Sequence, residues 1–299
     1  MVCMVMEGET VGCAEQGFWK VVKELGSGAY GEVFEVINTE TGKEGAMKAV
    51  KHSDAELEAS ALKTLASLPI VYVPIVYAKF PLSQEYTAIV MEIGAADLGT
   101  LRANNPNGVF TKKTSLSVAH HVVSVLWLSH EKGWIHRDVK EANIVLKKES
   151  KIQHPQPLLL IDFGIAYPIG NPEMQKNQPP FEESVYCSPA MAQGKPPQEK
   201  DDLIMTLYML MTGRGYDEFS DPKTSLMKRL EFEQDPFKYI TKPEDKWLGD
   251  IAKIVFCTED DQECGYQAIL DILAAAEKDF KPALHRFVIE GDENKPYIL

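Results

Sequence analysis

The sequence predicts an α+β fold in two parts, a small strand-rich part followed by a larger helical part. Over the first hundred residues, short runs of alternating polar and apolar residues are separated by turn residues, which is typical of antiparallel strands. From about residue 115 onward, apolar residues recur at three- and four-residue spacings, which is typical of helices. Residues 93–96 are mostly small and show neither a helix nor a strand pattern, so we predict that they connect the two parts.

The strand-rich part is predicted to begin as an antiparallel meander. The expected strands of this part are Phe18–Leu25, Glu32–Val36, Ala46–Val50 and Thr87–Glu92. The glycine-rich segment Gly26–Gly31 (GSGAYG) joins the first two strands, and the turn residues of Asn38–Lys43 join the second to the third.

One helix is expected within this part of the chain. Ser53 and Glu56 have the spacing of a capping box, which predicts that the helix begins there. Glu58, Leu62 and Leu65 follow at i, i+4 and i+7 and therefore share one face of the helix.

The larger part is predicted to be helical, with one short buried strand at Leu158–Ile161. The expected helices are Ser115–Glu131, Asp201–Met211, Leu226–Phe232, Lys246–Cys257 and Gln267–Lys278. The helix at Asp201–Met211 is apolar nearly all round, which predicts that it is buried. The last residues, Glu290–Leu299, are expected to form a frayed tail.

The composition excludes several classes of protein. With 44% hydrophobic and 25% charged residues, the 299-residue chain is not disordered overall. The 31 Lys and Arg against 44 Asp and Glu give a net charge of −13, which argues against wrapping nucleic acid or an anionic membrane. The five cysteines have scattered spacings, which predicts free thiols in a reducing compartment. We expect a monomer in the cytoplasm that could also enter the nucleus, with no nucleic-acid or membrane partner.

Several motifs in a fixed order carry the chemistry. Gly26–Gly31 alone has the spacing of a dinucleotide-binding loop, but here it joins two strands rather than a strand and a helix. The strand lysine Lys48 follows it, then His136–Asn143 (HRDVKEAN) after the first long helix, and Asp162–Gly164 (DFG) after the apolar strand. In this order the motifs resemble the signature set of the protein kinase family.

Finer features resemble the casein kinase 1 group, and within it tau-tubulin kinase-like members. They are the connector Val90–Leu101, the segment from Tyr186 to Leu203, which lacks an Ala-Pro-Glu motif, and the buried helix at Leu207–Leu210. The resemblance covers residues 17–285 and implies a two-lobed protein kinase fold, with an antiparallel β-sheet N-lobe and one main helix at 17–93 and a mostly helical C-lobe at 94–285. Residues 1–16 would form an N-terminal extension and residues 286–299 a C-terminal tail.

The resemblance implies a Ser/Thr protein kinase that acts on protein substrates and uses ATP and Mg²⁺. Lys48 would hold the α- and β-phosphates, and Glu58 would pair with Lys48 and keep it in place. Glu56 is the alternative partner, but it lies on another side of the predicted helix from Leu62 and Leu65.

The resemblance also implies roles for residues of His136–Asn143 and Asp162–Gly164. Asp138 would act as the catalytic base toward the substrate hydroxyl, and Lys140 would neutralise the γ-phosphate during transfer. A lysine two residues after the aspartate is the Ser/Thr form of this motif. Asn143 and Asp162 would hold Mg²⁺ through hard oxygen ligands.

The nucleotide-binding residues are carried over by position in the family pattern. The full implied set is Leu25, Gly26, Ser27, Gly28, Ala29, Tyr30, Gly31, Val33, Ala46, Lys48, Met91, Glu92, Gly94, Val145 and Ile161. The glycine hairpin would cover the phosphates. Met91 would be the gatekeeper, and the backbone of Glu92 and Gly94 would hydrogen-bond the adenine. For Ile161, ordinary core packing is an equal alternative to contact with the nucleotide.

The sequence also departs from the family pattern. Glu141 replaces a common proline, which we expect to be tolerated. The segment Asp162–Met191 carries four acidic residues and one lysine, a net charge of −3, which favours substrates with neutral or basic flanks. Ser184 and Tyr186 could pair with Arg137 after phosphorylation, but members of this group are mostly active without it, so we expect constitutive activity.

Two other functions stay open. A pseudokinase would use the fold as a binding scaffold, because a fold does not fix a function. Pseudokinases usually lack at least one member of the set Lys48, Glu58, Asp138, Asn143 and Asp162, and this chain contains all five. A nucleotide-binding oxidoreductase depends on the glycine spacing alone and lacks the expected βαβ unit.

Overall fold

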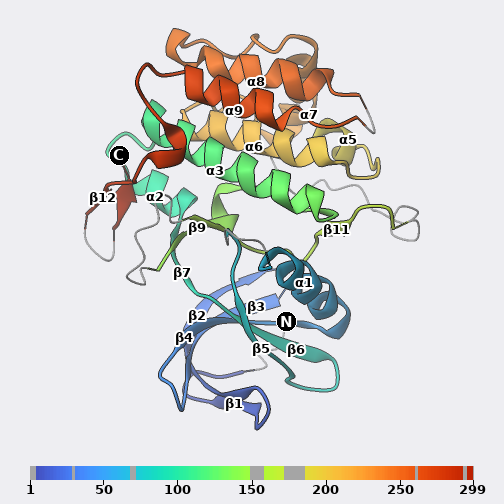
Figure 1. The fold of residues 1–299 in the computed structure, drawn as a ribbon, viewed down its shortest axis with the longest axis vertical. Helices are drawn as coiled ribbons and strands as arrows, with labels where there is room; N and C mark the ends of the chain where they lie inside the picture. Colours follow the sequence, from blue (N-terminus) through green and yellow to red (C-terminus); the bar gives the residue numbers. More distant parts are fainter. Residues whose placement is uncertain are drawn as a thin grey trace. The chain divides into compact units, whose positions relative to one another are not determined.

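The structure is a computed structural model, and it describes residues 5–28, 31–67, 72–148, 158–171, 186–259, 262–291 and 295–298. The chain divides into two compact units. The strand unit contains Met1–Ala95, Leu146–Lys148 and Leu159–Ala166, and the helical unit contains Ala96–Val145, Glu149–Leu158 and Tyr167–Leu299. Figure 1 shows strands β1 to β6 with helix α1 in the first unit, and a set of packed helices in the second.

A six-stranded antiparallel sheet forms most of the strand unit, in the order β1-β2-β3-β4-β6-β5. Its strands are β1 (Thr10–Cys13), β2 (Gly17–Gly28), β3 (Gly31–Asn38), β4 (Glu44–Lys51), β5 (Val76–Pro81) and β6 (Tyr86–Met91). The four predicted strands are present and the meander is confirmed. Strands β1 and β5 were not predicted, and β1 pairs with β2 although it precedes the expected domain start at residue 17.

The two faces of this sheet carry different residues. Residues directly opposite one another on neighbouring strands share a face, and so do residues two apart on one strand. Val33 lies opposite Lys48, and Ala46 lies opposite Met91, so these four residues share one face. The other face belongs to a buried hydrophobic core that includes Trp19, Val21, Phe34, Val36, Met47, Ala49, Ala88 and Val90.

Helix α1 (His52–Leu65) follows β4 without a loop, and its buried residues include Glu58, Leu62 and Leu65. The predicted capping box is wrong. The residue that precedes the helix is Lys51, and it makes no side-chain capping bond. Ser53 lies inside the first turn and donates its hydroxyl to Asp54 Oδ1 at 2.9 Å. Because the chain passes directly from strand to helix, the helix starts one residue before the serine, at His52.

Helices form most of the second unit. They are α2 (Leu98–Asn104), α3 (Lys112–Glu131), α5 (Pro189–Ala192), α6 (Glu199–Gly213), α7 (Pro222–Gln234), α8 (Lys246–Cys257) and α9 (Tyr266–Ala275), with short 3₁₀ turns at Glu141–Asn143, Pro243–Asp245 and Pro282–Leu284. Helix α6 is buried nearly all round, as predicted, and it packs against α3 and α8. Helices α3, α6 and α7 are longer than expected.

Short strands complete the fold. Strands β7 (Gly94–Asp97), β9 (Ile144–Lys147) and β10 (Leu158–Leu160) form a sheet in the order β10-β9-β7, and β8 (Trp134–Ile135) pairs with β11 (Tyr167–Pro168). The prediction of a frayed tail is wrong for the described residues. β12 (Ile289–Glu290) pairs with β13 (Tyr297–Ile298). Ile298 is buried, and Asn104 donates to the carbonyl of Pro296 at 3.0 Å.

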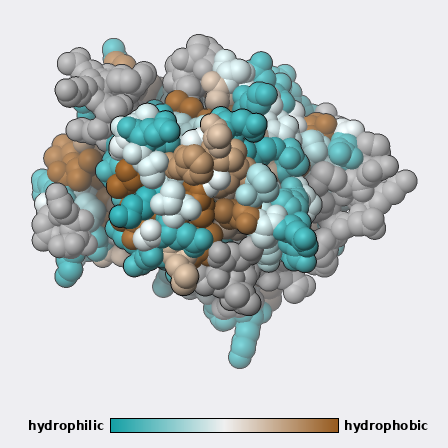
Figure 2. Space-filling model, turned by 90° about the horizontal axis from the view of Figure 1, so that it is seen from below, coloured by the Kyte–Doolittle hydropathy of each residue, from teal (hydrophilic) through white to brown (hydrophobic). Residues whose placement is uncertain are grey.

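Figure 2 shows the surface at the end of the molecule where β1 lies, with hydrophobic residues near the middle of the face and hydrophilic residues around them. Within the described ranges, no helix is long and apolar enough to cross a bilayer. The cysteines Cys13, Cys187, Cys257 and Cys264 are free thiols.

Candidate active site

In the strand unit, Lys48 on β4 lies between two carboxylates. Its Nζ is 2.8 Å from Glu58 Oε2 on α1 and 2.6 Å from Asp162 Oδ1. Lys48 and Glu58 are both buried. The expected pairing of Lys48 with Glu58 is therefore present. The alternative residue Glu56 is exposed and instead accepts a bond from Lys79 at 2.6 Å.

The electrostatics of this group depend on burial and on the paired charges. Burial alone would lower the pKa of Lys48, but Glu58 and Asp162 outweigh it, so the pKa lies above its usual value. Burial also raises the pKa of Glu58, while the charge of Lys48 opposes this shift. A buried ammonium held by two carboxylates is a fixed positive charge with a defined position.

The Asp162–Gly164 turn has the backbone shape and the space that this cluster needs. Asp162 adopts a φ of 66°, a left-handed conformation that is uncommon for a residue with a side chain. A Cβ atom at Gly164 would lie 2.9 Å from Lys48 Nζ and 3.1 Å from Asp162 Oδ1. Glycine at this position therefore leaves room for the charged groups.

The glycines at the end of β2 and the start of β3 differ in their steric surroundings. A Cβ at Gly26 or Gly28 would meet no atom within 4 Å, so steric crowding does not require glycine there. Gly31 has a φ of 132°, and a Cβ there would overlap the carbonyl oxygen of Ala49. Leu25 is 46% exposed. Ser27 lies opposite Glu32 in the hairpin, and the candidates Ala29 and Tyr30 fall outside the described residues.

The other nucleotide-binding candidates of the strand unit lie where the meander places them. Met91 is buried opposite Ala46, and Gly94 begins β7. The Glu92 amide donates to the carbonyl of Ile75 at 2.8 Å. Ile161 is half-buried beside Asp162 in the sequence. Val145 is buried in the helical unit.

In the helical unit, two predicted residues converge on the Asp138 carboxylate. Lys140 Nζ lies 2.6 Å from Asp138 Oδ2, and Asn143 Nδ2 donates to the same oxygen at 3.0 Å. Asn143 also donates to the backbone carbonyl of Asp138 at 2.8 Å. Asp138 and Asn143 are buried, whereas Lys140 is half-buried. The loop thus presents a carboxylate, an ammonium and an amide at one place.

A buried aspartate of α6 accepts hydrogen bonds from the loop that leads to Asp138. Asp202 accepts bonds from the backbone amides of His136 and Arg137, each at 2.7 Å, and from His130 Nε2 at 2.8 Å. Burial would raise the pKa of Asp202, but these donors and His136 lower it below its usual value. The bonds fix Arg137 at a φ of 72°. Sequence reasoning missed His130, because it lies on α3 and carries no local motif.

Each unit contains one predicted Mg²⁺ ligand with an oxygen atom that suits a hard cation. The side-chain nitrogen of Asn143 is used by Asp138, so its side-chain oxygen is the atom left for a ligand. Asp162 supplies a carboxylate in the strand unit. These are the oxygen types that Mg²⁺ prefers. In the described ranges, no group of three His, Cys, Asp or Glu could hold a metal ion.

Residues 186–188 of the Asp162–Met191 segment are anchored in the helical unit. Tyr186 shares a side-chain hydrogen bond with Thr212, and the Cys187 carbonyl accepts from Arg229. Ser188 Oγ donates to Asp201 Oδ1 at 2.5 Å. Residues 172–185, with Ser184, lie outside the described residues, so the expected activity without a phosphate that pairs with Arg137 stays a prediction.

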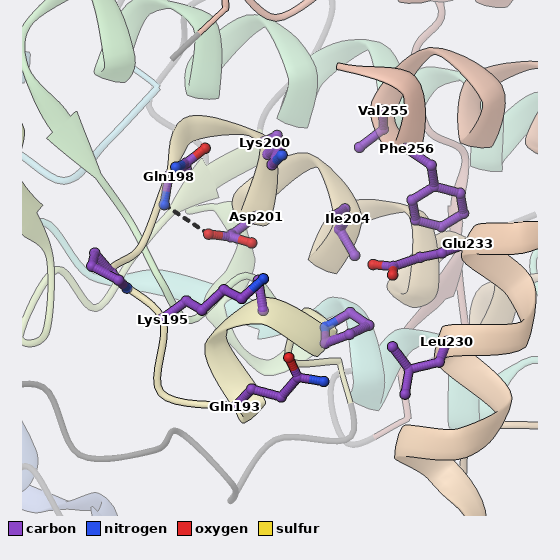
Figure 3. Close-up of a pocket in the computed structure, with 13 residues that line it drawn as sticks. Gln193, Lys195, Gln198, Lys200, Asp201, Ile204, Leu230, Glu233, Val255 and Phe256 are labelled. Atoms are coloured by element: carbon purple, nitrogen blue, oxygen red, sulfur yellow. Dashed lines mark hydrogen bonds between the residues drawn. The ribbon is translucent and has the colours of Figure 1, made fainter. Parts of the chain in front are cut away.

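Asp201 lines a cavity of about 310 Å³ in the helical unit (Figure 3). It accepts from the Gln198 amide at 2.7 Å, and the labelled side chain of Glu233 points into the cavity beside Ile204. Burial raises the pKa of Asp201 to about 6, although bonds from Ser188 and Gln198 oppose the shift.

Comparison with known proteins identifies the family to which the chain belongs. The protein kinase domain family matches residues 19–256, and the chain belongs to this family. The solved structure of vaccinia related kinase 3 is similar in fold, with a TM-score of 0.79, 16% identity and 93% coverage of both chains. The predicted two-lobed protein kinase fold is confirmed.

Particular relatives refine this assignment. A Caenorhabditis elegans protein named as a casein kinase I is 29% identical over 155 residues, which is 50% of this chain and 44% of the relative. Ser/Thr protein kinases of Dictyostelium discoideum and Streptomyces coelicolor are each 31% identical, over 53% and 64% of this chain and 32% and 38% of their own lengths. The chain thus spans less than half of each relative. The resemblance to the casein kinase 1 group is confirmed, and the tau-tubulin kinase-like placement stays a prediction.

Proposed function

We propose that the protein transfers the γ-phosphoryl group of Mg-ATP to serine and threonine hydroxyls of protein substrates. The observation that carries this proposal is the pair of ion contacts that hold Lys48 between Glu58 and Asp162. The family and the names of the Ser/Thr kinase relatives support the same reaction. Phosphoryl transfer depends mainly on positioning and charge neutralisation, and this chain has groups for both.

Lys48 binds the α- and β-phosphates of the nucleotide in this proposal. Its ammonium is buried and its position is set by Glu58, so little reorganisation is needed when a phosphate arrives. Gly26 and Gly28 carry no side chain, so backbone amides of the hairpin can approach the phosphate oxygens closely. The sheet face that carries Val33, Ala46 and Met91 contacts the adenine.

Asp138 orients the acceptor hydroxyl and takes its proton. Asn143 and Lys140 both bond to Asp138 Oδ2, so Oδ1 is the oxygen that faces the hydroxyl. Lys140 is half-buried and can turn from Asp138 toward the γ-phosphate. Asn143 and Asp162 hold Mg²⁺, which neutralises phosphate charge when it is bound.

We also propose that the preferred substrates have neutral or basic residues around the acceptor. The segment Asp162–Met191 has a net charge of −3, and the whole chain has a net charge of −13. A basic flank is attracted to such a surface, whereas an acidic flank is repelled. A peptide array tests this preference, and strong selection of acidic or phosphorylated flanks would contradict it.

The kinase activity is tested against the scaffold alternative with two parallel measurements. One follows transfer of ³²P from γ-labelled ATP to a mixed serine and threonine peptide library, with Mg²⁺ or with excess EDTA. The other measures ATP binding by isothermal titration calorimetry. An active kinase binds ATP and labels peptides only with Mg²⁺. Binding without labelling would favour a pseudokinase.

A further inference from the structure

An ion pair between the half-buried Arg102 and the buried Glu141 links α2 to the 3₁₀ turn that contains Asn143. Arg102 Nε donates to Glu141 Oε1 at 2.7 Å, and an Nη of Arg102 donates to Glu141 Oε2 at 2.9 Å. The other Nη donates to the carbonyl of Gly108 at 3.1 Å. The guanidinium therefore holds the carboxylate in a two-bond fork and is itself fixed to the loop after α2.

Two glycines enclose the Glu141 side chain. A Cβ at Gly99, in the first turn of α2, would lie 3.5 Å from Glu141 Cβ. A Cβ at Gly213, at the end of α6, would lie 3.9 Å from Glu141 Oε1. Glu141 is only 6% exposed. The glycines on two sides and the two charge-assisted hydrogen bonds restrict the conformation of the Glu141 side chain.

Glu141 lies directly after Lys140 and two residues before Asn143, so its fixed position constrains both. The backbone amide of Asn143 also donates to the backbone carbonyl of Lys140 at 3.0 Å across the turn. Any tilt of this turn would move the two groups that contact Asp138. The charges of Glu141 and Arg102 also act on Tyr186. Burial raises the pKa of Tyr186, the charge of Glu141 adds to this shift, and the charge of Arg102 opposes it.

We propose that Arg102 and Glu141 are positioning residues, which fix the 3₁₀ turn so that Lys140 and Asn143 meet the Asp138 carboxylate in the reactive arrangement. This inference rests on the proposed phosphoryl transfer, because it assigns these residues to that reaction. Neither residue is assigned a contact with ATP or the acceptor. Losing the pair therefore changes the rate of the chemical step rather than nucleotide binding.

The test compares Arg102→Gln, Glu141→Gln and the double variant with a matched control. Arg214 and Asp245 form another ion pair of the helical unit, in which both residues are buried, with Arg214 Nε 2.8 Å from Asp245 Oδ1. Arg214→Gln therefore measures what losing such a pair does to stability alone. All assays are run well below the lowest melting temperature of the set.

We expect each single Arg102 or Glu141 variant to lower kcat by about 10- to 100-fold, with the KM for ATP changed less than about twofold. The double variant should be no slower than the slower single variant, because both act through one contact. Arg214→Gln should keep kcat within about twofold. Equal kcat losses in Arg214→Gln and the other variants, or additive losses in the double variant, would overturn the proposal.

A second measurement is independent of catalysis. Hydrogen exchange, followed by mass spectrometry of peptides that cover residues 138–145, reports opening of the turn. We expect about tenfold faster exchange there in Arg102→Gln and Glu141→Gln but not in Arg214→Gln. If the wild type transfers no phosphate but exchange changes in this way, the kinase proposal fails and the structural role of the pair stands. Unchanged exchange would overturn that role.

Discussion

A Cβ atom at Gly164 would lie 2.9 Å from the Nζ of Lys48, closer than real Cβ atoms approach such a group. The atom it would displace is the end of a flexible side chain rather than backbone. A methyl group at this position therefore moves the ammonium and leaves the fold in place. Glycine here keeps the charged cluster of Lys48, Glu58 and Asp162 intact.

Gly164→Ala should reduce activity with little loss of stability. The displaced ammonium would lose one of its charge-assisted bonds, each worth about 1.5–3 kcal/mol, so we expect kcat/KM for ATP to fall by about 10- to 100-fold. The melting temperature should change by no more than a few degrees. Steady-state kinetics and thermal unfolding on one preparation check this. A large drop in melting temperature would contradict the explanation.

The two glutamates of α1 should differ sharply when neutralised. Glu58→Gln removes the charged partner of Lys48, so kcat/KM for ATP should fall at least about tenfold. Glu56→Gln, on the same helix, removes only an exposed pair with Lys79 and should leave the activity unchanged. If both variants lost activity equally, the assignment of Glu58 would be wrong.

The contrast between these residues shows what the sequence could predict. The face shared by Glu58, Leu62 and Leu65 follows from helical periodicity, so the partner of Lys48 could be chosen before the structure was known. The motif residues Asp138, Lys140 and Asn143 lie within one short loop, so their convergence was also predictable. Local spacing carries this kind of information.

Long-range contacts were not predictable in the same way. Arg102 and Glu141 are 39 positions apart in the sequence, and only the packing of α2 against the 3₁₀ turn brings them together. The terminal strand with Ile298 and its partner β12 have only two residues each, too few to show a periodicity in the sequence, so a frayed tail was expected instead. The start of α1 was misplaced because the fold joins a strand to a helix without a loop.

The free cysteines should react at different rates with an alkylating reagent. Burial raises the pKa of Cys187 to about 12 and that of Cys264 to about 12, whereas Cys257 is exposed. At pH 8 a thiol with a pKa near 12 is about one part in ten thousand thiolate. Cys257 should therefore be labelled before Cys187 and Cys264, as followed by peptide mass spectrometry. Labelling of Cys187 as fast as Cys257 would show that its segment opens readily.

Asp201 should make stability depend on pH in a defined direction. Its pKa is about 6 in the folded protein and about 4 in an unfolded chain, so the folded state holds the proton more tightly. The contribution of Asp201 to stability therefore rises as pH falls from 7 to 4, by up to about 3 kcal/mol. Denaturation midpoints of the wild type and Asp201→Asn across this range check it. A constant difference between the two would contradict the raised pKa.

The transfer of phosphate by the wild type and Asp138→Asn tests the central claim most directly. The variant keeps the shape of the side chain and an oxygen that can accept from Lys140 and Asn143, but it removes the base. We predict a kcat at least about a hundredfold below that of the wild type, with ATP affinity within about twofold and the label on serine and threonine. Equal kcat values for the two proteins, or no transfer by a wild type that binds ATP, would contradict the account.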